Sequence, residues 1–240
     1  MKKLLVFVAT LVFVRLTGGD NNPQPSVREA TVMNEDEKLY ALFMHNEARG
    51  RANPSASNMV RMIWDKALEQ DAIEYSRKCI YEHDPDRSVG RKFNHVGENL
   101  YIGFPALGPK EFLKVSIDFW NNERFNYTFD TNECTLLCGH YTQMLWDDTF
   151  ALGCGISLCN NIDAGDRVLD IGQLLVCRYG PAGNINNRRP YVRGTYCAVC
   201  PRDYWCEGNL CTRSAGRRLC VNYGFVMLLC MLVQLVCSLC

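Results

Sequence analysis

Fourteen cysteines in 240 residues constrain the fold of this chain more than any other feature. The N-terminus explains them: two lysines precede the apolar run Leu4–Val14, and small residues follow at 17–19. This pattern predicts a secretory signal peptide over 1–19, because a retained membrane helix needs about 20 apolar residues. Secreted proteins mature in an oxidising compartment, so this density of cysteine indicates disulfides rather than metal sites.

The C-terminal segment, residues 214–240, carries a second targeting signal. Val221–Cys240 has no charged residue, and the small residues Ser214, Ala215 and Gly216 lie upstream of it. Small residues, a short spacer and an apolar tail are typical of a glycosylphosphatidylinositol (GPI) attachment signal. The alternative is a single-pass membrane segment, which would place two arginines on the outer side, against the positive-inside rule. We favour the lipid anchor; localisation is then the extracellular side of the plasma membrane, with free secretion as the alternative.

Charge and glycosylation signals point to an exposed extracellular surface. The formal net charge is zero, from 26 basic and 26 acidic residues, and long basic runs are absent from the sequence. A nucleic-acid partner is therefore not expected. Asn126 begins the sequon Asn-Tyr-Thr and predicts a glycan, whereas Pro54 excludes Asn53 as an acceptor.

Periodicity predicts three helices in the first 120 residues. Residues 20–33 are polar, contain two prolines and are expected to be a leader. Asn34, with acids in the following turn, caps a helix that runs to about Arg51. The second and third helices are marked by the cap Asp65, the first-turn Pro109, the inner stripe Leu68, Ala72, Tyr75 and Cys79, and the expected buried face Phe112, Val115, Phe119 and Trp120.

The second half predicts a hairpin and a small disulfide-dependent unit. The apolar runs Phe150–Leu158 and Val168–Tyr179 flank a polar turn, which indicates an antiparallel hairpin. A short helix begins at Gly139 and should end at a solvated turn at Asp147-Asp148. The organised part is one domain over 34–190, followed by a short cysteine-rich hinge over 191–213 that is too small for a core of its own.

Four motifs carry a family resemblance. They are HNEAR (His45–Arg49), GENL (Gly97–Leu100), GHYTQMLWDDT (Gly139–Thr149) and LLVCRYGPAGNI (Leu174–Ile185). In this order they resemble the CAP superfamily of cysteine-rich secretory proteins, antigen 5 and class-one plant pathogenesis-related proteins. The Cys134-x-x-x-Cys138 spacing, the PYVRG segment and the membrane-directed tail are most similar to the glioma-pathogenesis-related subgroup.

The resemblance implies an α+β fold, an α–β–α sandwich with a small antiparallel sheet between helices and a disulfide-rich C-terminal appendage. It also implies five disulfides, which the spacing alone leaves open among many pairings. The implied pairs are Cys79–Cys159, Cys154–Cys177, Cys134–Cys138, Cys197–Cys206 and Cys200–Cys211. Cys220 has no assigned partner.

The family's central cavity maps onto His83, Glu98, Glu123 and His140, all of which are present. The resemblance implies that His83 and His140 are metal ligands and that the two acids line the cavity and orient the rings. Two imidazoles completed by water make a weak, open zinc site, since structural zinc takes four protein ligands. The alternatives are a satisfied, partly buried His140 and a solvent-facing His83. His45 is expected to be structural, and His95 has no expected role.

Two classes of function follow. The first is a surface-anchored or secreted binding or adhesion module, for which the resemblance implies sterol or lipid ligands, or a cell-surface protein partner in gamete or cell recognition. The alternative is a metal-dependent extracellular hydrolase of the protease type, with Glu98 or Glu123 as general base. The sequence lacks HExxH and GxSxG motifs, which disfavours an enzyme. A channel modulator is a weaker third reading, because the cysteine-rich segment stops after four cysteines.

Overall fold

The structure is a computed structural model that describes residues 24–88, 92–103 and 107–213. The predicted signal peptide over 1–19 and the predicted anchor signal over 214–240 lie outside the described residues, as does Cys220. The helices are α1 (Glu35–Gly50), α2 (Lys66–Ser76), α3 (Pro109–Asn122), the 3-10 helix η1 (Glu123–Asn126) and α4 (Gly139–Met144). The strands are β1 (Ser26–Thr31), β2 (Ile63–Trp64), β3 (Gly97–Gly103), β4 (Tyr127–Thr128), β5 (Glu133–Cys134), β6 (Ala151–Asp163), β7 (Val168–Gly180), β8 (Tyr204–Glu207) and β9 (Leu210–Arg213).

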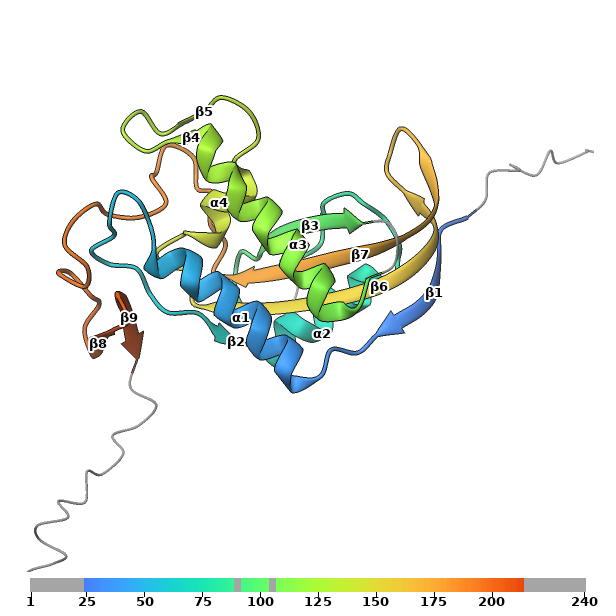
Figure 1. The fold of residues 1–240 in the computed structure, drawn as a ribbon, viewed down its shortest axis with the longest axis horizontal. Coiled ribbons are helices and arrows are strands. Elements are labelled where there is room, and N and C mark those ends of the chain that lie inside the picture. The colour runs from blue at the N-terminus through green and yellow to red at the C-terminus, as the bar shows by residue number, and fades with distance from the viewer. Residues whose placement is uncertain (1–23, 89–91, 104–106, 214–240) are drawn as a thin grey trace, which may run out of the picture.

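A twisted sheet built around one long hairpin forms the centre of the fold (Figure 1). Its strand order is β1-β6-β7-β3, all antiparallel, and the short β2 pairs with β6 in parallel. The predicted hairpin is therefore confirmed as β6 and β7. Both strands are apolar and buried over long runs rather than alternating, because helices cover both faces of the sheet.

Helices on both sides complete the α–β–α sandwich that the resemblance predicts. Helix α2 packs on one face of β6 and β7, while α1, α3 and α4 lie together on the other side (Figure 1). Two glycines of β6 allow the close approach of α2. A Cβ at Gly153 would lie 2.1 Å from the amide nitrogen of Glu69, and one at Gly155 would lie 2.5 Å from that of Ile73. The backbone of α2 thus rests directly on the strand.

The predicted helix starts are confirmed by their hydrogen bonds. The Asn34 side chain accepts from the Glu37 amide at 3.0 Å, and the Glu37 carboxylate accepts from the Asn34 amide at 2.8 Å, which is a capping box. The Asp65 carboxylate accepts from the amides of Ala67 and Leu68. Pro109 occupies the first turn of α3.

The predicted buried face of α3 is wrong in part. Phe112 and Trp120 are buried, but Val115 and Phe119 are exposed, and Leu113 and Ile117 face the core instead. Helix α1 departs further from an apolar stripe, because its buried positions include His45, Asn46 and Arg49 while Leu39 and Phe43 are exposed. Polar side chains on α1 therefore make specific hydrogen bonds inside the protein.

Arg49 makes the most hydrogen bonds of these buried groups. Its guanidinium donates to backbone carbonyls of Val60, Met144 and Trp146 at 2.5–2.9 Å, and also to those of Asp147 and Thr149. Burial lowers the pKa of Arg49 to about 9. The carbonyls at the end of α4 face this cation, which is the favourable end of a helix for positive charge. Arg49 thereby joins α1 to the loop before β2 and to the segment that runs from the end of α4 to β6.

Asp147, predicted to lie in a solvated turn, is buried, so this prediction is wrong for one of the two aspartates. Its carboxylate accepts from Asn58 and pairs with Arg188, whereas Asp148 is largely exposed. The turn is thus held from two loops rather than left in solvent.

Both ends of the described chain pack against the domain. Residues 26–31, expected to belong to a polar leader, form β1 on the edge of the sheet beside β6, so that expectation is wrong. At the other end, the β8–β9 hairpin of the 191–213 segment lies against residues 59–61. Leu210 and Cys211 are buried there, and Leu210 belongs to the main core.

Five disulfides link these parts, and they are the pairs that the resemblance implies. Cys154 and Cys177 face each other across β6 and β7, while Cys159 joins β6 to Cys79 after α2. The other three are Cys134–Cys138, Cys197–Cys206 and Cys200–Cys211. None of the helices in the described ranges has the length and apolar character needed to span a bilayer.

Candidate functional site

The four residues of the predicted cavity form two histidine–glutamate pairs. His83 precedes β3 in a loop, and its Nδ1 lies 2.6 Å from Oε1 of Glu98 on β3. His140 is the second residue of α4, and its Nδ1 lies 2.6 Å from Oε1 of Glu123, the first residue of η1. Each carboxylate therefore fixes one ring through the same nitrogen.

Arg178 on β7 supports the first pair. It is fully buried and contacts three carboxylates: Glu98, Asp84 at 2.7 Å and Asp71 at 3.1 Å. The same Glu98 Oε1 that meets His83 also accepts from the Asp84 amide at 3.1 Å. Three acids around one arginine leave a local excess of negative charge. His83 adjoins this cluster but keeps 60% of its side chain exposed.

Tyr75 of α2 lies beside this cluster, whose negative charges affect the pKa of its phenol. The Arg178 guanidinium stands over the Tyr75 ring, 5.0 Å from its centroid. Burial, with the negative charges of Glu98 and Asp84, raises the pKa of Tyr75 to about 12. The phenol therefore stays protonated at physiological pH and donates to the Glu82 carbonyl.

Backbone amides support the second pair. Oε2 of Glu123 accepts from the amides of His140 at 2.9 Å and Tyr141 at 3.1 Å, so the carboxylate caps the first turn of α4. The His140 ring stacks on Trp120, with centroids 5.9 Å apart, and 21% of the side chain is exposed. The second pair is thus more enclosed than the first.

A hydrogen-bonded chain joins the second pair to α1. Asn99 on β3 donates to the His140 carbonyl and to the Tyr179 hydroxyl, each at 3.1 Å. His45 lies fully buried between the Ala41 carbonyl and the Tyr179 hydroxyl, and its ring packs on Trp120. Burial lowers the pKa of His45 to about 4, so this ring is neutral at physiological pH.

Each pair leaves one ring nitrogen open to a ligand, and the four residues do not form a closed metal site. Because Nδ1 of each ring donates to a carboxylate, Nε2 is the nitrogen left for a ligand, which is the arrangement of carboxylate-supported metal-binding histidines. Yet among the described residues these four do not form a compact ligand group, since the one set of three His, Cys, Asp or Glu ligand atoms within 4.8 Å of one another is Cys197, Cys200 and Cys211. His83 and His140 would therefore hold an ion by two nitrogens, with water completing the shell.

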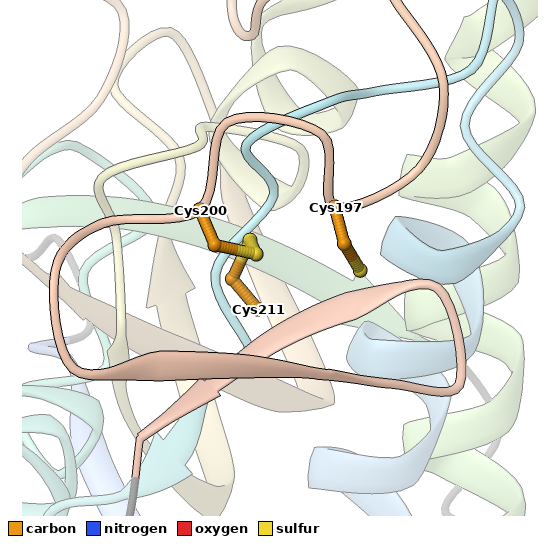
Figure 2. A group of neighbouring side chains, drawn as sticks. All are labelled: Cys197, Cys200 and Cys211. Carbon is orange, nitrogen blue, oxygen red and sulfur yellow. A yellow bond between two sulfur atoms is a disulfide. The ribbon is translucent and has the colours of Figure 1, made fainter.

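The three-cysteine group is not a second metal centre. Figure 2 shows Cys197, Cys200 and Cys211 where the chain after β7 meets β9. Cys200 and Cys211 are bonded to each other, and Cys197 is bonded to Cys206. Metal binding by cysteine requires the thiolate, which a disulfide does not offer. These sulfurs lie close because two bridges cross the same small unit.

The remaining predicted positions fall into distinct places. Asn126 ends η1, is partly exposed, and donates from Nδ2 to the Leu137 carbonyl at 3.0 Å. His95 has a backbone role, since its carbonyl accepts from the Ala182 amide. Arg178, Asp71 and Asn99 were not among the site residues predicted from the sequence. An arginine within the apolar run Val168–Tyr179 is the signal that could have marked Arg178.

The molecule is a disulfide-stabilised α–β–α domain with two carboxylate-held histidines. The chain belongs to the CAP family, described as the cysteine-rich secretory protein family, whose model matches residues 42–179. The recognition made from the motifs is confirmed, including the glioma pathogenesis-related subgroup.

Its relatives include GLIPR1-like protein 1 of Homo sapiens, which is 40% identical over 172 residues, covering 70% of this chain and 67% of the relative. Glioma pathogenesis-related protein 1 of Mus musculus is 35% identical and is covered to 66%, with 75% of this chain aligned. Peptidase inhibitor 16 of Mus musculus is 38% identical over 75% of this chain, but only 34% of that longer protein is covered.

Among solved structures, Na-ASP-1 matches with a TM-score of 0.62 and 25% identity, over 80% of this chain and 51% of that one. NaASP2 with Zn2+ matches with a TM-score of 0.57 and 25% identity, over 80% of this chain and 98% of that one. These matches confirm the predicted fold class.

Proposed function

We propose that this protein is an extracellular binding module rather than an enzyme. The observation that carries the proposal is the state of the two glutamates. Glu98 is occupied by His83, the Asp84 amide and Arg178, and Glu123 is occupied by His140 and two amides of α4. A general base needs a free lone pair directed at its substrate. These carboxylates instead hold the rings in place, which favours binding over hydrolysis.

The ligand class that we propose is a lipid or sterol, taken up by a groove between α1 and α3. The groove has a volume of about 670 Å³, within the size range of ligand pockets. Its lining combines the apolar Phe43, Met44 and Tyr141 with charged residues that include Glu47, Arg51 and Arg124. A lining of apolar and charged groups suits an amphipathic molecule.

A direct binding measurement tests this proposal. Purified protein is titrated with radiolabelled cholesterol and with palmitate, and Phe43→Ser is compared with Leu39→Ser, a matched change on the exposed side of the same helix outside the groove lining. We expect Phe43→Ser to weaken binding and Leu39→Ser to leave it unchanged. Equal binding by both variants would contradict the groove as the binding site, and absence of binding by the parent would contradict the proposed ligand class.

Zinc and surface attachment form the finer part of the proposal. We propose that His83 and His140 bind zinc weakly, a role supported by their ring orientation and by the zinc-containing neighbour. We also propose attachment to the outer membrane surface, for recognition of another cell. Mass spectrometry of the mature C-terminus tests it: a glycolipid remnant on Ser214, Ala215 or Gly216 supports the anchor, and an intact Cys240 rules it out.

The hydrolase alternative has a separate test. Peptide hydrolysis is measured with zinc and with a chelator, in the parent and in His140→Ala. Turnover that requires zinc and disappears in the variant would replace the binding-module proposal with an enzyme. We expect no chelator-sensitive turnover, because neither glutamate is free to activate water.

A further inference from the structure

Three apolar side chains near the β4–β5 hairpin are largely exposed to solvent. Phe125, Leu136 and Leu137 are 76%, 74% and 73% exposed, and together we call them the apolar tip. They lie beside the β4–β5 hairpin, which projects from the end of α3 (Figure 1). Exposed apolar side chains that gather on one part of a protein surface can mark a site that another group covers.

The tip is held together by hydrogen bonds that pass through Asn126. Its Nδ2 donates to the Leu137 carbonyl at 3.0 Å, and its carbonyl accepts from the Thr135 amide at 2.9 Å. The Cys134–Cys138 disulfide closes the loop that carries the two leucines. The loop is therefore closed and pinned with both leucines exposed.

We propose that an N-linked glycan on Asn126 covers the apolar tip. Asn126 directly follows Phe125 and donates to the Leu137 carbonyl, so a sugar on its amide nitrogen starts beside the loop that carries the two leucines. Asn126-Tyr127-Thr128 is also the only Asn-x-Ser/Thr sequon of the chain with a residue other than proline at its centre. The glycan acceptor nitrogen therefore lies beside the exposed apolar residues that a glycan could cover.

The chemistry of attachment preserves the local structure. Nδ2 forms a bond to C1 of the first N-acetylglucosamine, the C1–oxygen bond to the lipid diphosphate donor breaks, and one amide proton leaves. One N–H remains on Nδ2, and it can continue to donate to the Leu137 carbonyl. The acetyl group and the C–H face of the sugar then lie against Phe125 and the leucines.

The residues on either side of Phe125 and Asn126 already have partners within the protein. The Arg124 guanidinium stands 4.3 Å from the centroid of the Phe125 ring. The Tyr127 side chain turns away toward Tyr141 and Phe129, and its hydroxyl donates to Asn132. Phe125, Leu136 and Leu137 keep most of their surface open, and this is the surface that the glycan would take.

The test uses the full chain secreted from mammalian cells. Glycopeptide mass spectrometry reads the occupancy of Asn126, and fluorescence of a dye that binds apolar surface reads the tip. Thr128→Ala removes the acceptor signal while keeping Asn126 and its hydrogen bond, and Thr128→Ser is the matched control that keeps the signal. We expect Asn126 to be modified in the parent and in Thr128→Ser. Dye fluorescence should rise in Thr128→Ala and return to the parent level when Leu136→Ser and Leu137→Ser are added.

Native enzymatic removal of the glycan from the folded parent gives the same comparison if Thr128→Ala is not secreted. Unmodified Asn126 in the parent overturns the proposal, as does a modified Asn126 whose removal leaves dye fluorescence unchanged. Unmodified Asn126 combined with phosphatidylcholine vesicle binding that is lost on Leu136→Ser and Leu137→Ser also overturns it, and assigns the tip to a membrane surface instead.

Discussion

The two histidine–glutamate pairs have the same ring contact but opposite kinds of support. His83 and Glu98 meet at 2.6 Å, as do His140 and Glu123. Glu98 is held by a buried arginine shared with two further acids, whereas Glu123 is held by the first amides of α4. One carboxylate thus depends on an ion cluster and the other on the end of a helix.

The difference teaches that orientation of a ring and stability of its support are separate properties. Breaking a buried ion cluster leaves charges without partners, while removing a cap leaves neutral amides without an acceptor, which costs less. The enclosed His140 and the exposed His83 should therefore respond differently to equivalent changes, although each ring is oriented in the same way.

Arg178→Met should have the largest effect on stability. It leaves Asp71, Asp84 and Glu98 buried near one another without the arginine, so we expect a loss of about 3–5 kcal/mol in the free energy of unfolding. Urea denaturation measures it. The control Arg193→Met breaks a half-exposed pair with Asp130 and should cost less than about 1 kcal/mol. Similar losses in both variants would show that the ion cluster is not the support of the first pair.

Acid should lower the free energy of unfolding through His45 of α1, whose ring packs on the same Trp120 as the ring of His140. The pKa of His45 is lowered to about 4 in the folded protein, so the unfolded chain binds the extra proton first as the pH falls. Stability is then complete above about pH 6.5 and falls by roughly 3 kcal/mol toward pH 4.

The difference between the parent and His45→Gln isolates this contribution. Other groups titrate in both proteins, whereas only the parent has the imidazole. Unfolding curves at several pH values should give a steeper decline in the parent than in the variant. Parallel declines would mean that His45 is not held as a neutral ring.

Glu123→Gln should have a moderate effect confined to the second pair. The amide keeps one acceptor but loses the charge that faces His140 and the first turn of α4, so we expect a loss of about 1–2 kcal/mol. Nitrogen-15 NMR of the imidazoles should show a change at His140 and none at His83. Glu133→Gln, on the exposed β5, should change neither ring. A change at His83 would show that the pairs are coupled.

Zinc should have the smallest effect and should need both pairs together. With two nitrogen ligands the affinity is low, and zinc at about ten times its Kd would add about 1.4 kcal/mol to the free energy of unfolding. Thermal unfolding with and without zinc should show this gain in the parent and in His95→Ala. It should be absent from both His83→Ala and His140→Ala. A gain that survives one of those two variants would place the metal elsewhere.

Local sequence signals predicted the parts of the fold that depend on neighbours along the chain. The caps Asn34 and Asp65, the first-turn Pro109 and the β6–β7 hairpin all follow from a few adjacent residues. The roles of His83 and His140 were expected instead from the family resemblance, because their spacing along the chain does not indicate which carboxylate each ring meets.

The rest depended on contacts between distant residues. β1 was missed because its sequence SVREAT is polar and an edge strand buries little. The inward face of α3 was misjudged in part, because Leu113 and Ile117 face the core where Val115 and Phe119 were expected. Arg178 gathers acids from α2, a loop and β3, and no local pattern predicts such a set.

The Cys154–Cys177 disulfide across β6 and β7 has a consequence for proteolysis. The turn between these strands, residues 164–167, lies within the 23-residue separation of Cys154 and Cys177. A single cut in that turn would divide the polypeptide into two pieces that stay covalently linked by this disulfide. Each of the other four disulfides lies wholly within one piece. A protein cut there would therefore remain one covalently linked molecule until Cys154–Cys177 is reduced.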